Sequence, residues 1–211
     1  MTTIWGPLGW MTLHSVATSY PERPTPSEQE LMSTWLDMFR DTITCPSCKG
    51  HFTELLQTYR ARFPNMMQSR QEFALFSFRA HNTVNRRLNK PIYATLDDCI
   101  ATLKNNIKTR TARDYRVSYI NHITRHWRTF QDIQGITALK KIAEMKKIED
   151  DYIASRDTSF NVPLFPDLVI LPTGILEKSV ETPGPGRPAV RFAPGGPKRG
   201  LVLGAGGFRM R

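Results

Sequence analysis

Apolar residues recur at helical spacing through the first hundred residues, and prolines or polar turns interrupt them at short intervals. The first such stretch ends before Pro21, because a residue that precedes proline is driven away from helical geometry. Ser27 and Glu30 have the spacing of a capping box and would begin the second helix. The expected helices cover about 7–19, 27–41, 45–59, 71–88 and 96–107. This pattern predicts a mainly α fold, a compact bundle of four to five helices.

The pattern changes after residue 107. A helix from Tyr115 to Phe130 is expected, and Gly135 separates it from a charged helix over about 136–156. A short apolar run at 168–171 has the length of a strand, and residues 183–211 hold six Arg or Lys, no acid and many Gly and Pro. We therefore divide the chain into a domain at 1–107, a partly helical, solvated extension at 108–182 and a basic tail at 183–211.

The net charge is +10, from 29 Lys and Arg against 19 Asp and Glu. Such a charge permits attraction to nucleic acid, anionic lipid or acidic proteins without selecting one, and we expect the tail to contact polyanions weakly. No window approaches about 18 uninterrupted apolar residues, and no basic-then-apolar leader opens the sequence. The expected location is therefore the cytoplasm, with no membrane span.

Cys45 and Cys48 form the C-x-x-C pair of a chain that has only three cysteines. Thr44 can cap a helix that begins here, which would place both cysteines in its first turn, and Pro46 suits that turn because its missing N–H is not needed there. Unpaired backbone N–H groups at a helix start favour a thiolate. The pair is therefore predicted to be oxidisable and nucleophilic.

Two alternatives to a redox role remain open for this pair. One is a pair of buried structural cysteines; the other is a zinc site that combines the pair with His51 and either His81 or Cys99, although the sequence offers no second close pair of ligands. Haem attachment is excluded, because Lys49 stands where C-x-x-C-H requires histidine. A thioredoxin-like site fits poorly, because no βαβ pattern accompanies the pair.

A redox dithiol needs an acceptor for two electrons, and the chain lacks a second cysteine pair. Trp10 and His14 are four residues apart, as are His81 and Asn85, so each helix can present a ring or amide pair to a flat ligand. For Trp10 and His14 an ordinary place in the core is the competing interpretation. The amides beside His81 need hydrogen-bonding partners in either case.

At these residues the sequence resembles the Erv/ALR family of FAD-linked sulfhydryl oxidases. The family order is G-x-x-x-W-x-x-x-H, then C-x-x-C, then H-N-x-V-N-x-x-L-x-K-P, and this chain has all three elements in that order. They span Gly6 to His14, Cys45 to Cys48 with His51 and Phe52 after it, and His81 to Pro91. The resemblance covers about the first hundred residues.

The resemblance implies a helical bundle that binds FAD beside the redox disulfide. Cys45 would exchange with the dithiol of a protein substrate, and Cys48 would pass electrons to the flavin, with molecular oxygen as final acceptor and hydrogen peroxide as product. The cofactor-binding residues implied by the resemblance are Gly6, Trp10, His14, His51, His81, Asn82, Val84, Asn85 and Lys90. No metal is expected. Activity is expected to reside in 1–107, where every motif lies.

The chain departs from cellular members of the family, which usually carry a shuttle cysteine pair and a second structural disulfide. Cys99 resembles the first cysteine of that disulfide but has no partner downstream, so a free thiol is expected. The compact form is similar to the enzymes of large DNA viruses, which implies the host cytoplasm or the virion as its location. Family members commonly pair, so a homodimer through the first helices is expected. The alternative function is a structural virion or capsid-associated protein that keeps the fold and uses its basic extension as an assembly contact.

Overall fold

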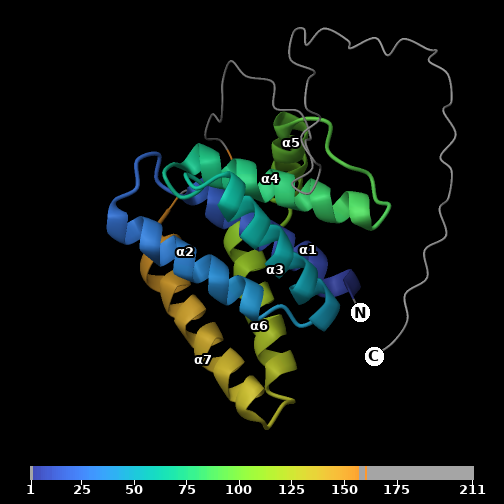
Figure 1. Cartoon of the computed structure of the whole chain (residues 1–211), viewed down its shortest axis with the longest axis vertical. Coiled ribbons are helices and arrows are strands. Elements are labelled where there is room, and N and C mark those ends of the chain that lie inside the picture. Colours follow the sequence, from blue (N-terminus) through green and yellow to red (C-terminus); the bar gives the residue numbers. More distant parts are fainter. Residues whose placement is uncertain (1, 157–159, 161–211) are drawn as a thin grey trace, which may run out of the picture. The chain divides into compact units, whose positions relative to one another are not determined.

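A computed structural model of the chain describes residues 2–156 and 160, and the regular elements in that part are helical (Figure 1). The mainly α prediction is thus confirmed for the described residues. The elements are α1 (Thr2–Ser19), α2 (Pro26–Asp41), α3 (Pro46–Arg62), α4 (Arg70–Arg87), α5 (Leu96–Asn106), α6 (Ala112–Trp127), α7 (Ile133–Ile148) and the π-helical turn η1 (Glu149–Ile153).

The start of α2 differs from the prediction. Thr25 is the N-cap, and it exchanges hydrogen bonds with Glu28 in a capping box, so the box expected at Ser27 and Glu30 is wrong. Both pairs have the required spacing, but Pro26 decides between them. Proline is favoured at the first helical position, where its missing N–H costs nothing, and this places the cap one residue earlier.

Three other helix boundaries also move. α1 begins at Thr2, so Pro7 lies inside it, and α6 runs over Ala112–Trp127 because Thr111 and Asp114 form its capping box. Gly135 does not separate two helices but lies in the first turn of α7, where its N–H donates to the Asp132 side chain. A Cβ at this glycine would overlap the backbone of Phe130, so the tight turn before α7 requires glycine.

α1 lies at the centre of the described part, with α4 and α6 packed against it, while α7 packs against both α2 and α6 (Figure 1). The main core joins Leu13 and Val16 of α1 to Tyr119 and Ile123 of α6. The core therefore continues past residue 107, and the described helices beyond it are not the solvated extension that we expected. Most charged side chains of α7 are exposed, and its buried residues Ile142, Met145 and Ile148 complete the core.

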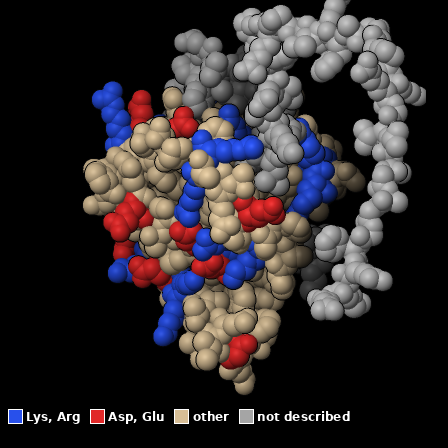
Figure 2. Space-filling model, in the orientation of Figure 1, with Lys and Arg blue, Asp and Glu red and all other residues tan. Residues whose placement is uncertain are grey.

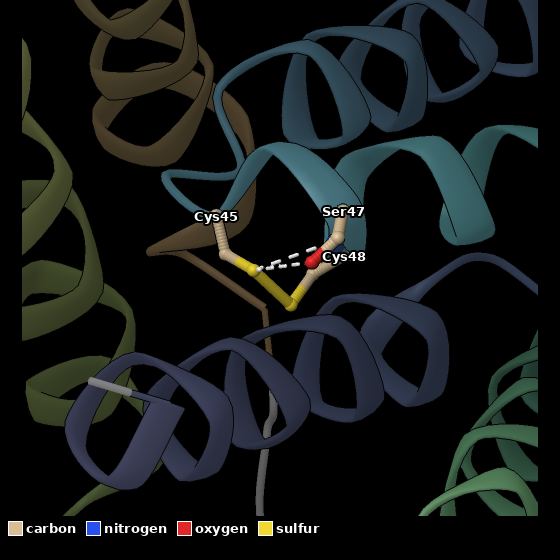
Figure 3. Close-up of a disulfide and its surroundings, with 3 residues drawn as sticks. All are labelled: Cys45, Ser47 and Cys48. Atoms are coloured by element: carbon tan, nitrogen blue, oxygen red, sulfur yellow. Dashed lines mark hydrogen bonds between the residues drawn. A yellow bond between two sulfur atoms is a disulfide. The ribbon is translucent and has the colours of Figure 1, made fainter.

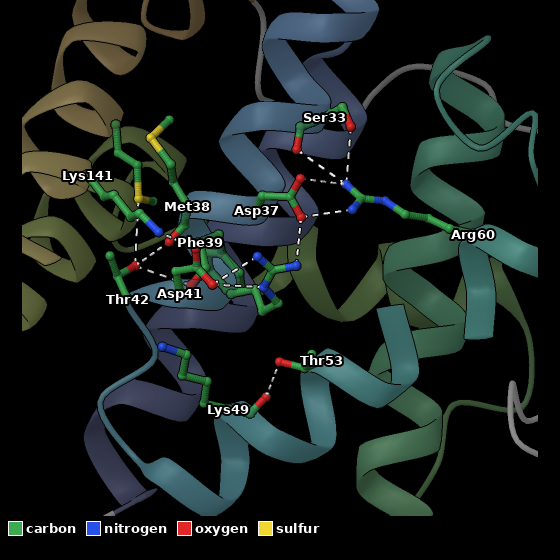
Figure 4. A network of polar contacts seen from close by, with 12 residues as sticks. Ser33, Asp37, Met38, Phe39, Asp41, Thr42, Lys49, Thr53, Arg60 and Lys141 are labelled. Atoms are coloured by element: carbon green, nitrogen blue, oxygen red, sulfur yellow. Dashed lines mark hydrogen bonds and ion pairs between the residues drawn. The ribbon is translucent and has the colours of Figure 1, made fainter. Parts of the chain in front are cut away.

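Ion pairs connect the helices around this core. Asp37 of α2 is bound to Arg60 of α3 at 2.8 Å, and Asp41 of α2 is bound to Lys141 of α7 (Figure 4). A further pair is buried: Arg116 of α6 holds Glu149 of η1 through two hydrogen bonds of 2.7 and 2.9 Å. The Asp41–Lys141 pair, together with Arg116 Nη1 lying 3.3 Å from Ser15 Oγ of α1, attaches the helices beyond residue 107 to the first two.

The faces of α1 and α2 bear on the expected homodimer. Within the same chain α6 packs against α1 and α7 packs against α2, so these contacts occupy part of the surface of the first helices, and the homodimer stays a prediction. Figure 2 shows Lys and Arg interspersed with Asp and Glu on the visible face of the described part. None of the described helices is long and apolar enough to cross a membrane. The strand expected at 168–171 and the tail at 183–211 lie outside the described residues.

Candidate active site

A cavity of about 370 Å³ opens between α1, the start of α3, the end of α4 and the loop that follows α4. Its lining is largely aromatic and aliphatic, with a cationic edge. The lining includes Trp5, Gly6, Trp10, Phe39, Ile43, Cys48, Phe52, His81, Val84, Asn85, Arg87, Leu88, Lys90, Tyr93 and Asn106. An apolar cavity with a few convergent polar groups is the usual form of a small-molecule site.

Cys45 and Cys48 form a disulfide at the start of α3, with Cα atoms 5.2 Å apart. Cys45, and not Thr44 as predicted, is the N-cap: the Cys48 N–H points at Cys45 Sγ from 3.3 Å, and the Ser47 hydroxyl lies 3.4 Å from the same sulfur (Figure 3). Cys48 lines the cavity, whereas Cys45 does not. The two sulfurs are therefore inequivalent, with one facing the cavity and one outside it.

Trp10 of α1 and His81 of α4 form one wall of the cavity. The Trp10 and His81 rings stack with centroids 4.2 Å apart and an interplanar angle of 7°. His14 is buried behind them and does not line the cavity; its Nε2 is 2.9 Å from His81 Nδ1. Burial lowers the pKa of His14 to about 3 and that of His81 well below its ordinary value, so both imidazoles are neutral at pH 7.

The asparagines of α4 hold the loop that completes the cavity. Asn82 donates to the Tyr93 carbonyl at 3.0 Å and accepts from its N–H at 2.9 Å, and Asn85 donates to the Pro91 carbonyl at 3.1 Å. Asn85 also lines the cavity, whereas Asn82 does not. The amides that needed partners therefore find them in the protein backbone, and this positions Lys90 and Tyr93 at the cavity edge.

The lining includes residues that the motifs did not identify. The cavity also has the rings of Trp5, Phe39 and Tyr93 in its lining. Phe39 was not identified because its helical spacing is that of an ordinary core residue, and Tyr93 because it lies after the last motif. His51 points to solvent on α3 and is not part of the lining. Trp5 and Tyr93 are aromatic residues that lie just outside a motif, and this position is the sequence feature that could have identified them.

Cys99 is a free thiol, as expected, and it is buried in a second apolar cluster with Leu75 and Phe78. Burial raises its pKa to about 12, so it stays protonated at neutral pH. Among residues 2–156 and 160, no three His, Cys, Asp or Glu side chains come together in a group that could hold a metal ion.

The cavity fits a large, flat aromatic ligand. Trp5 Nε1 is buried without a hydrogen-bonding partner among the described residues, so a ligand oxygen or nitrogen could accept from it. A Cβ at Gly6 would meet no heavy atom within 4 Å, so the packing of the protein itself does not require glycine at this position of the lining. The stacked Trp10 and His81 rings, Asn85 and Lys90 supply an aromatic surface, an amide and a cation to such a ligand.

Comparison with known proteins identifies the family. The model of the Erv1/Alr family matches residues 8–111, which include Cys45, Cys48 and His81. A FAD-linked sulfhydryl oxidase of African swine fever virus is 32% identical over 88 residues, which are 42% of this chain and 71% of that protein. The chain belongs to the Erv1/Alr family. The match ends where α6 begins, so α6 and α7 lie outside it.

Other relatives share a smaller part of their length with this Erv1/Alr chain. A protein of Invertebrate iridescent virus 3 is 34% identical over 88 residues, 42% of this chain and 58% of that protein. A FAD-linked sulfhydryl oxidase of Saccharomyces cerevisiae is 31% identical over 99 residues, 47% of this chain and 46% of that protein. The chain thus spans about half the length of these two relatives. No solved structure matches it.

Proposed function

We propose that this Erv1/Alr protein is a FAD-dependent thiol oxidase that forms disulfides in cysteine-containing proteins. One observation carries the proposal: the only cysteine pair of the chain is a disulfide with one sulfur at an aromatic cavity and the other outside it. The names of the relatives from African swine fever virus and yeast support FAD as the ligand of that cavity. Gly6, Trp10, His81, Val84, Asn85 and Lys90 would contact it directly.

Cys45 would receive the substrate. A substrate thiolate attacks Cys45 Sγ, the Cys45–Cys48 bond breaks, and Cys48 leaves as a thiolate. The second substrate thiol then attacks its partner sulfur in the mixed disulfide and releases Cys45. The substrate has lost two electrons and two protons, and the cysteine pair has gained them. Bound FAD would supply the acceptor for these two electrons, with oxygen as the final acceptor and hydrogen peroxide as the product.

The helix start favours Cys45 as the leaving sulfur in the second exchange. The Cys48 N–H and the Ser47 hydroxyl both lie within hydrogen-bonding distance of Cys45 Sγ and would stabilise a thiolate there, as does the positive end of the α3 dipole. A better leaving thiolate speeds thiol–disulfide exchange. Cys48, which packs against the core, is held at the cavity instead.

Buried side chains prepare the cavity for this role. His14 supports His81 from behind, and Asn82 holds the loop that carries Tyr93, so both act through residues of the lining. His51 has no such contact; if it binds the cofactor, it does so from the surface of α3.

Viral relatives support an origin in a large DNA virus, with the host cytoplasm or the virion as location. The alternative of a structural virion protein depends on the tail, which lies outside the described residues.

The purified full chain tests the proposal. We expect a yellow protein with a flavin spectrum that consumes oxygen when a dithiol is added and releases hydrogen peroxide in equal amount. A Cys45→Ser, Cys48→Ser double variant should keep the colour and lose thiol-dependent oxygen consumption. A colourless protein that does not bind added FAD would refute the proposal.

A further inference from the structure

A line of hydrogen bonds runs from the interior of α4 to the cavity. Ser77 Oγ lies 2.8 Å from the Ala74 carbonyl and 2.9 Å from His14 Nδ1, and His14 Nε2 lies 2.9 Å from His81 Nδ1. Ser77 and His14 are 1% exposed, so water does not compete for these bonds. His81, the last residue of the line, lines the cavity.

The directions of these bonds depend on where the single hydroxyl proton of Ser77 lies. With that proton donated to the Ala74 carbonyl, which can only accept, Ser77 Oγ accepts from His14 Nδ1–H. His14 is neutral, so its Nε2 carries a lone pair and accepts from His81 Nδ1–H. The protonated Cys99 thiol, 4.0 Å from the same Nε2, agrees with an acceptor at this atom. His81, also neutral, is left with an unprotonated Nε2.

We propose that Ser77 and His14 are positioning residues that fix His81 in its Nδ1–H tautomer, so that Nε2 is a hydrogen-bond acceptor and the site selects a ligand with a donor at this place. Trp10 stacks on one side of the His81 ring, and Tyr93 contacts it edge-on with centroids 5.3 Å apart, so the ring cannot turn to exchange its nitrogens without losing both contacts. Only the identity of the ligand, FAD, rests on the proposed function.

The tautomer can be measured directly. In the full chain with ¹⁵N-labelled histidine, NMR should show the proton of both His14 and His81 on Nδ1, in the absence of FAD and at neutral pH. A proton on His81 Nε2 would overturn the proposal. This measurement needs no substitution, and it is independent of activity.

Ser77→Ala removes the acceptor that sets the direction of the line. His14 should then move its proton to Nε2 and donate to His81, whose own proton should appear on Nε2. The affinity for FAD, measured by titration, should fall by about threefold to tenfold, since one hydrogen bond of the ligand is lost. The matched control is Ser19→Ala, which removes a buried hydroxyl bonded to the Val16 carbonyl of α1 and should change neither tautomer nor affinity.

The outcomes separate this inference from the proposed function. Unchanged tautomers in Ser77→Ala, or equal loss of FAD affinity in Ser19→Ala, would overturn the role of Ser77. If the protein binds FAD and the His81 proton is on Nε2, the oxidase proposal stands and the assignment of the Nδ1–H tautomer to His81 is refuted. Tautomers as assigned without any FAD binding would refute the oxidase proposal and the donor requirement for FAD, while the hydrogen-bond line would stand.

Discussion

Replacing Glu149 by Gln should destabilise the whole described fold, because it leaves a charge buried without a counterion. The Arg116 and Glu149 side chains are 2% and 3% exposed and share two hydrogen bonds, and Arg116 also lies 3.3 Å from the Ser15 hydroxyl of α1. Removing one member of a buried ion pair costs about 3–5 kcal/mol. We expect a loss of that size in the free energy of unfolding, measured on the full chain by denaturant titration followed by circular dichroism.

Two comparisons make the magnitude informative. The double variant Arg116→Met, Glu149→Leu should recover most of the loss, since an apolar pair of similar volume needs no counterion. Asp150→Asn, in the exposed pairs with Lys146 and Arg113, should cost less than about 1 kcal/mol, because solvent screens these pairs. A Glu149→Gln protein within about 0.5 kcal/mol of the unaltered protein would refute this account of how α6 and η1 are held to α1.

Three further predictions follow from the core and the cavity. A chain that ends after residue 107 would expose the apolar faces of α1 and α2 that α6 and α7 cover. Light scattering should therefore find the shortened chain self-associated or unfolded and the full chain monomeric. A dimer of the full chain would contradict this prediction. Gly6→Leu should abolish FAD binding while Gly50→Leu keeps it, because a Cβ at either glycine meets no protein atom but only Gly6 lines the cavity; equal binding by both variants would remove Gly6 from the site. Cys99→Ala should turn over at nearly the normal rate, because that thiol is buried and protonated; a hundredfold loss, about 2.7 kcal/mol, would instead indicate a third redox cysteine.

The helices of the first hundred residues could be predicted from apolar spacing, because each buries one face. Their exact starts could not always be predicted. Ser27 with Glu30 and Thr25 with Glu28 have the same spacing, and only Pro26 distinguishes them. Gly135 was mistaken for a separator because glycine commonly ends helices, whereas here it is required by a contact with Phe130 that spacing does not show.

The candidate site was predictable to the extent that its chemistry is local in sequence. Cys45 and Cys48 lie three residues apart, and the expected disulfide is present. The role of Asn82 depends on the Tyr93 backbone, and that of Ser77 on His14 across two helices, so neither could be read from its own segment. The packing of α6 on α1 is likewise a tertiary contact, and the composition of residues 108–156 did not predict it.

The absorption spectra of two single variants test the central claim, that Cys48 and not Cys45 faces the flavin. With FAD bound, Cys45→Ser frees the Cys48 sulfur at the cavity, and contact of its thiolate with the electron-poor ring should produce a long-wavelength charge-transfer band. Cys48→Ser removes the sulfur from the cavity and should show an ordinary flavin spectrum. A band in Cys48→Ser alone would reverse the two roles, and a band in neither would show that the disulfide does not lie beside the flavin.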